Sequence, residues 1–221
     1  MALTAANILS RAAIIVQDMT NVRWPESELL GWLNDGRREL AIARPDIYST
    51  VATQALSTGA KQALPSGALR LMDIPRNTSG AAITVTERGW LDKQNPSWHQ
   101  MTPASTVKHF MLDERNQGNY WVYPPAASGA SVEIIYQAAP VDYSTSSTLT
   151  AYEELYGGAL VDYICYRAFS KDSEYAGNAQ RALAHYTQFA NALGVGQKVN
   201  LTNSPNLANV GGVPSKQMAV G

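Results

Sequence analysis

The stretch from Thr150 to Leu193 constrains the fold more than any other part of the chain. Its first half spaces apolar residues as on the buried face of a helix, at Tyr152, Leu155, Tyr156, Ala159, Leu160, Tyr163, Ile164 and Ala168. Its second half alternates intervals of three and four, the seam that packs helix against helix, at Ala176, Ala179, Leu183, Tyr186, Ala190 and Leu193. Thr150 and Glu153 have capping-box spacing, which marks the start of the first helix. The short polar segment SKDSEYAGN between the halves predicts an antiparallel helical hairpin.

Two more amphipathic helices are expected near the N-terminus. Residues 2–19 carry an apolar face with helical spacing, made by Ile8, Leu9, Ala12, Ile15, Val16 and Met19. A second helix occupies residues 25–45, bounded by two prolines: proline suits the first helical position and disfavours helix in the residue before it. Gly31 and Gly36 lie inside this helix, where glycine costs about 1 kcal/mol relative to alanine. We interpret both as positions of close packing.

The pattern changes after residue 46. Short segments rich in β-branched and aromatic residues alternate with turn sequences such as STG, PSG, NTSG and NQGN. The expected strands are TVATQAL, ALRLMDI, AITVTER, VKHFMLD, NYWVYP and SVEIIYQ. The clearest hairpin turn is NQGN, whereas residues 90–98 break the pattern and predict a helical turn or loop. This segment is therefore expected to be an antiparallel β module of about six strands.

The order helix, helix, β module, helix, helix predicts an α+β fold. The simplest arrangement packs the helices as an antiparallel four-helix bundle with the β module inserted in the middle connection. The expected domains are residues 1–46 with 148–194 for the bundle and 47–147 for the β module. Residues 195–221 would form an extended, flexible C-terminal arm.

The last segment differs in composition from the rest of the chain. It contains no aromatic and no acidic residue, and it is rich in glycine, asparagine, serine and proline. Such a segment cannot form a core, so it is either disordered or an arm that becomes ordered on a partner. Isolated apolar residues between flexible polar ones suit binding in a groove or as an added strand. These residues are Val199, Leu201, Leu207, Val210, Val213 and Met218.

Composition narrows the possible functions. Charged residues make up only 16% of the chain, against about a quarter in typical soluble domains, which favours a protein packed against others. The net charge of -1 provides no bulk attraction for nucleic acid. The single cysteine, Cys165, cannot form an internal disulfide and suits a reducing compartment. No signal peptide or membrane-spanning run is apparent, so we expect a chain that is made and used, or assembled, in a cytoplasm.

No catalytic or cofactor-binding motif stands out. The three histidines, His99, His109 and His185, have no metal-ligand spacing, and the sequence lacks zinc, nucleophile-elbow and nucleotide-binding motifs. Adjacent acidic residues point to different faces and make poor acid–base pairs. We therefore expect no cofactor and no enzymatic activity. The alternatives are a small cytoplasmic hydrolase using these histidines and acidic pairs, or a single-stranded nucleic-acid binder stacking bases on Tyr120, Trp121 and Tyr123.

Four stretches carry a resemblance to a known family. They are WPESELLGWLNDGRRELAIARPD, NPSWH, NYWVYPPAASG and, above all, ALVDYICYRAFSKDSEYAGNAQRALAHYTQF. Together they resemble the head-to-tail adaptor (connector) proteins of short-tailed bacteriophages. The resemblance covers most of the chain up to Leu193.

The resemblance implies a structural virion protein in the neck between capsid portal and tail, assembled in the host cytoplasm. Such adaptors form a ring, usually of about twelve copies, around a channel through which genomic double-stranded DNA passes without sequence-specific binding. The implied partners are other copies of the chain, the portal protein, and tail nozzle or tail-fibre proteins, with no membrane. The C-terminal arm would embrace the portal. Channel-facing candidates on the last two helices are Lys171, Arg181 and Gln188.

Overall fold

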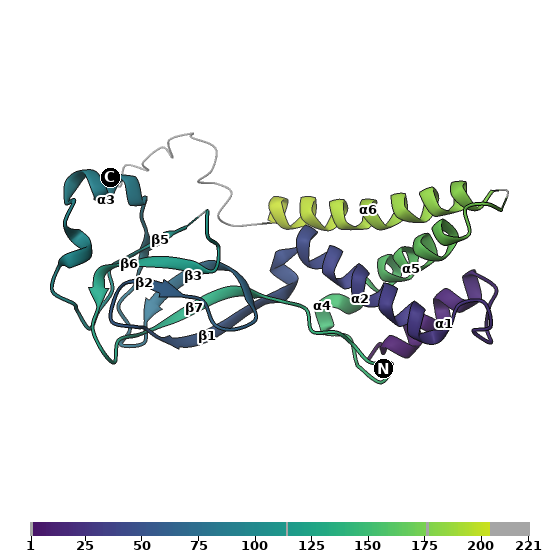
Figure 1. The fold of residues 1–221 in the computed structure, drawn as a ribbon, viewed down its shortest axis with the longest axis horizontal. Helices are drawn as coiled ribbons and strands as arrows, with labels where there is room; N and C mark the ends of the chain where they lie inside the picture. Colours follow the sequence, from purple (N-terminus) through teal and green to yellow (C-terminus); the bar gives the residue numbers. More distant parts are fainter. Residues whose placement is uncertain (1, 114, 176, 204–221) are drawn as a thin grey trace, which may run out of the picture. The chain divides into compact units, whose positions relative to one another are not determined.

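The computed structural model describes the backbone of residues 2–113, 115–175 and 177–203, and side chains up to Gly194. The chain divides into two compact units (Figure 1). A helical unit comprises the residues up to Arg44 and from Asp142 onward, and a β unit comprises Pro45–Val141. The predicted α+β class is confirmed by the helices and by the two sheets.

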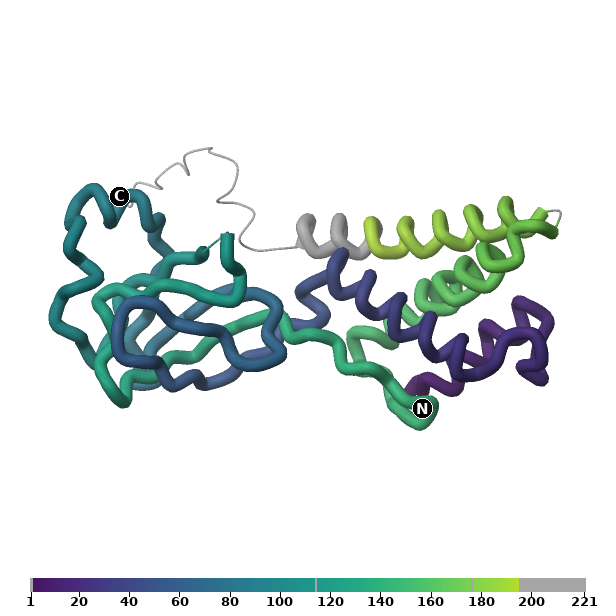
Figure 2. The backbone as a smooth tube through the Cα atoms, viewed as in Figure 1, coloured from purple at the N-terminus to yellow at the C-terminus, as the bar shows by residue number. Residues whose placement is uncertain are grey.

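Three helices of the helical unit share one hydrophobic core. They are α1 (Ala5–Ile15), α2 (Glu26–Ala43) and α5 (Gly157–Lys171). Although α5 is far from the other two in sequence, it packs against both of them (Figure 2). The core is filled by Ala5, Ile8, Leu9, Ala12, Trp24, Leu29, Trp32, Leu33, Leu149, Leu160, Val161, Ile164, Cys165 and Ala168.

The last helix, α6 (Asn178–Asn203), packs on α5. Aromatic pairs Tyr163–Phe189 and Tyr166–Tyr186 have ring centroids 5.0 Å apart in each case, and their order shows that the helices are antiparallel. The predicted hairpin is thus confirmed.

The expected antiparallel four-helix bundle is wrong. Among the described residues, the core shared by α1, α2 and α5 contains no side chain from α6. Instead, α6 attaches to the outside of α5, and up to Gly194 its buried apolar residues are Ala182, Phe189 and Leu193. A narrow contact face of this kind reaches one neighbouring helix and not three. The helix also continues to Asn203, ten residues past the end of the expected hairpin at Leu193.

The predicted third helix is split in two. A short α4 (Ala151–Glu154) carries the predicted capping box, in which the Thr150 hydroxyl accepts from the Glu153 amide. The chain then turns before α5, so Tyr152 and Leu155 are 65% and 80% exposed instead of buried. The break precedes Gly157, where an added Cβ would lie 2.7 Å from Leu3 Cδ2. Close packing against the N-terminal segment therefore determines where α5 begins.

The β unit contains two sheets with a core between them. One sheet has the strand order β1-β7-β3 and the other β2-β6-β5-β4. The strands are β1 (Ser49–Ala55), β2 (Gly59–Ala63), β3 (Ala68–Asn77), β4 (Thr84–Val85), β5 (His109–Leu112), β6 (Asn119–Ala126) and β7 (Ser131–Ala138). The core is formed by Leu56, Leu71, Ile74, Ile83, Val107, Phe110, Tyr120, Val122, Ala126, Ala130, Val132 and Ile134.

Two details of the β unit differ from expectation. The strand β2 was not predicted, because GAKQA lacks β-branched and aromatic residues. The module is also not wholly antiparallel, since β4 pairs parallel to β5. The NQGN hairpin is confirmed by the antiparallel pairing of β5 with β6. Between β4 and β5 lie α3 (Arg88–Gln94) and a short 3-10 helix, Trp98–Gln100. A second 3-10 helix, Pro45–Tyr48, precedes β1.

Candidate interaction surfaces

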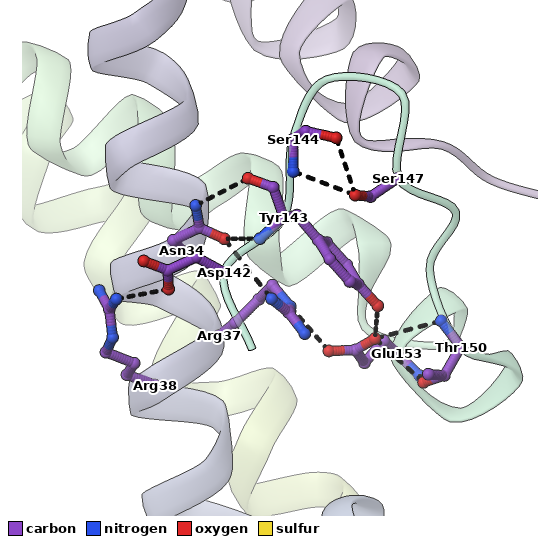
Figure 3. A network of polar contacts seen from close by, with 9 residues as sticks. All are labelled: Asn34, Arg37, Arg38, Asp142, Tyr143, Ser144, Ser147, Thr150 and Glu153. Carbon is purple, nitrogen blue, oxygen red and sulfur yellow. Dashed lines mark hydrogen bonds and ion pairs between the residues drawn. The ribbon is translucent and has the colours of Figure 1, made fainter. Parts of the chain in front are cut away.

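A buried polar network fastens the segment returning from the β unit onto α2. The Arg37 guanidinium donates to Glu153 Oε1 at 2.8 Å, and Glu153 is fully buried. The other oxygen of this carboxylate accepts from the Tyr143 hydroxyl at 2.5 Å and from the Thr150 amide at 3.1 Å. Figure 3 shows the four side chains converging. A buried charge pair with these additional hydrogen bonds holds the segment in one position.

The same segment is joined to α2 at a second point. The Asn34 side-chain nitrogen donates to the Tyr143 carbonyl at 3.1 Å, and its oxygen accepts from the Tyr143 amide at 2.8 Å (Figure 3). The Arg37 guanidinium lies 3.3 Å from the centre of the Tyr143 ring. Burial, followed by the hydrogen bond to Glu153, raises the pKa of Tyr143 to about 12. The network is therefore a structural clamp, with its phenol protonated at neutral pH.

The predicted channel-facing residues lie on α5 and α6, and two of them have partners. Lys171 forms an ion pair with Glu28 at 2.5 Å, and the Arg181 guanidinium lies 5.7 Å from the centre of the Phe169 ring. Arg181 and Gln188 are exposed. Their position in an assembly remains a prediction.

The predicted arm residues lie at or past the limit of the described structure. Val199 and Leu201 belong to the last turns of α6. The remaining four, Leu207, Val210, Val213 and Met218, lie outside the described residues.

The histidines occupy separate places, and each has a structural neighbour. His99 stacks on Trp98, with ring centroids 3.7 Å apart. His109 Nδ1 is 2.7 Å from the Thr84 hydroxyl, and His185 Nδ1 is 2.8 Å from Asp162 Oδ1. Across the described residues, no group of three or more histidine, cysteine or acidic side chains is placed to hold a metal ion. Nothing in this arrangement favours the hydrolase hypothesis.

The aromatic strand β6 does not present a stacking platform. Tyr120 and Val122 share one face of the strand and are fully buried between the sheets. On the opposite face, Trp121 and Tyr123 pack against the cluster that contains the fully buried Trp98. Only Trp121 and Tyr123 remain partly exposed, and both pack against their own chain, so the structure gives no support to the single-strand-binding hypothesis.

Sequence reasoning missed an exposed apolar side of α6. Of its predicted seam, Leu183 is 66% and Tyr186 46% exposed, and Ala179 and Ala190 are also exposed. A hollow of about 390 Å³ lies beside them, lined by Tyr166, Ser170, Ser173, Ala179, Ala182, Leu183 and Tyr186. The seam spacing was recognised from the sequence, but only the structure shows that these residues stay exposed beside α5.

A second exposed apolar surface lies at the end of α1 and in the loop that follows. Its members are Ile14, Ile15, Met19 and Val22, with exposed fractions from 44% to 84%. The loop is held by Asp18, whose carboxylate accepts from the backbone amides of Val22, Arg23 and Trp24. These bonds, with that from Trp24 the strongest, lower the pKa of Asp18. We call this surface the α1 corner.

A helical unit with an inserted β unit, exposed apolar surfaces and a structural polar clamp is typical of a protein that works by assembly. The sequence model of the SU10 adaptor protein family matches residues 3–208. The chain therefore belongs to the SU10 adaptor protein family, in agreement with its resemblance to phage head-to-tail adaptors. A search of curated proteins found no match. Membership implies a structural protein of the phage neck that associates with portal and tail proteins.

In the portion of the chain that the structure describes, no helix combines the length and the apolar character needed to cross a bilayer.

Proposed function

We propose that this protein forms a ring, of about twelve copies, between the portal and the tail. The ring surrounds a channel through which genomic double-stranded DNA leaves the capsid. The observation that carries the proposal is the family match, which spans both units and extends to residue 208. Assembly takes place in the host cytoplasm, and a tail nozzle or tail-fibre protein binds the face opposite the portal.

The charge distribution supports free passage of DNA. A ring multiplies every phosphate contact by the number of copies, so a strongly basic channel would hold DNA instead of letting it slide. The chain has a net charge of -1, and Lys171, a channel-facing candidate, is paired with Glu28. Arg181 and Gln188 would complete a weakly charged wall.

The C-terminal arm, residues 195–221, would hold the portal protein. Its apolar residues, Val199, Leu201, Leu207, Val210, Val213 and Met218, would be the contacts. Because α6 extends to Asn203, Val199 and Leu201 would be presented to the portal from the last turns of this helix.

The test is co-elution of the purified protein with the portal protein of the same phage, followed by electron microscopy of the complex. The full chain should bind and form rings on the portal. A chain ending at Asn203 should bind at least tenfold more weakly, as should the full-length variant V210S/V213S, which keeps the arm's length. Absence of any complex with the full chain would refute the adaptor proposal, whereas equal binding by all three would refute only the role of the arm.

A further inference from the structure

The exposed seam of α6 has the sequence signature of a helix–helix contact, but within the described residues it is left largely uncovered. Its members, Ala179, Leu183, Tyr186 and Ala190, alternate intervals of three and four, as packing seams do. The contact with α5 is centred on Ala182, Phe189 and Leu193, the last of which belongs to the predicted seam. Tyr186 borders this contact, with its ring 5.0 Å from that of Tyr166, and the rest of the seam is exposed. An apolar seam of this kind on a water-exposed helix marks an interaction surface.

The polar residues of α6 support this interpretation. Solvent-facing helices normally carry many charged side chains, yet between Asn178 and Gly194 there are no carboxylates and the one permanently charged residue is Arg181. Arg181 lies on the opposite side of the α5 contact from the seam, in a hollow with Ile15, Phe169 and His185. The seam side is therefore uncharged.

The α1 corner lies on the side of the α5–α6 contact that is opposite to the seam. Ile15, at the end of α1, lines the hollow that contains Arg181 and His185, whereas the seam lines the hollow next to Tyr166 and Ser170. The helical unit thus exposes two different apolar surfaces on opposite sides of the α5–α6 contact. The hydrogen bonds to Asp18 hold Met19 and Val22 outward in advance of binding.

We propose that the α6 seam of one copy packs against the α1 corner of the next copy. This contact is head-to-tail, because each copy contributes a different surface to each of its two neighbours, and such contacts generate closed rings when the rotation between copies closes. The inference rests on the proposed ring and names the surfaces that join its members.

The size of the seam argues for copies held in an assembly and against a stable two-protein complex. From Ala179 to Ala190 the helix is about 18 Å long and about 10 Å wide, which gives a footprint on the order of 200 Å² per partner. Stable complexes bury about 800 Å² per partner. A single seam contact is therefore weak, and it becomes effective only when many copies are held side by side.

Cysteine cross-linking tests the arrangement. The variant L183C/M19C carries one thiol on each surface, and both native side chains are mostly exposed, so the fold should be unaffected. A short bismaleimide should convert it into a ladder of dimers, trimers and larger species, at high protein concentration or on the portal. L183C alone and M19C alone should stay monomeric, and their mixture should stop at dimers. The control L183C/I42C places its second thiol on the equally exposed Ile42 of α2 and should give no ladder.

Three outcomes would overturn the proposal. The first is a homodimer formed by L183C alone, which would indicate a symmetric contact between two seams. The second is an equal ladder from L183C/I42C, and the third is the absence of a ladder from L183C/M19C. Portal binding is measured on the same samples, so the two proposals fail separately. Portal binding without a ladder refutes the named surfaces, and a ladder without portal binding refutes the adaptor role.

Discussion

Replacing Glu153 by glutamine tests the buried clamp. The change keeps the shape of the side chain and the acceptor for the Thr150 amide, but it removes the negative charge next to Arg37. Both side chains are almost completely buried, with 4% and 0% exposed for Arg37 and Glu153. The guanidinium would then keep its charge in a dry environment after losing the carboxylate of Glu153.

Breaking a buried ion pair at one partner costs about 3–5 kcal/mol, a large part of the roughly 5–15 kcal/mol that stabilises a typical domain. For a unit of this size the loss lowers the melting temperature by about 10–20 °C. Differential scanning calorimetry of E153Q against the unaltered protein measures the shift. The transition of the helical unit should move, because the clamp lies entirely within it.

Two further variants separate the buried charge from other effects. R37M/E153Q removes both charges and should recover most of the stability lost in E153Q, since no unpaired ion remains. R38Q breaks the pairs of Arg38 with Asp35 and Asp142, in which the arginine side chain is 49% exposed. It should cost less than about 1 kcal/mol. The reasoning would be refuted if E153Q were no less stable than R38Q, or if the double variant were as unstable as E153Q.

The remaining predictions concern glycine packing, alkaline pH and the thiol. G36A should lose about 1–3 kcal/mol in urea unfolding, because a Cβ would lie 2.9 Å from Tyr163 Cδ1, whereas G31A, with open space around it, should gain about 0.5–1 kcal/mol. The pKa of Tyr143 is raised from 10.0 to about 12 on folding, so the stabilisation that it contributes is complete below pH 10 and lost between 10 and 12; Y143F should show a smaller loss of stability there, and an unchanged slope would contradict this. Burial raises the pKa of Cys165 to about 12, so iodoacetamide should label the unfolded chain and leave the native protein unlabelled at pH 8 by mass spectrometry.

Helix positions were predictable where periodicity and end signals agree. The second helix lies between its two prolines as expected, and the capping box of Thr150 and Glu153 forms. The antiparallel hairpin at NQGN also forms as predicted. These features depend on neighbours in sequence, so local patterns are sufficient to find them.

The clamp and the two exposed surfaces were not predictable from local patterns. Arg37 and Glu153 are 116 residues apart in the chain, and nothing near either residue indicates that they meet. Gly36 was recognised as a packing position but Gly31, assigned the same role, faces open space. Which of two similar glycines is packed depends on the crossing of α2 with α5.

The stretch around α6 shows most clearly what each level determines. Its spacing alone specifies a helix with an apolar seam, because side chains three and four residues apart share a face. Whether that seam is buried within the chain depends on how far the helix rotates about its own axis when it packs. Tertiary structure sets this rotation by packing Phe189 against Tyr163, which leaves Leu183 66% exposed and Tyr186 at the edge of the contact, 46% exposed. The sequence by itself therefore determined that α6 has an apolar seam, and only the tertiary structure decided which of its residues are buried against α5 and which stay exposed.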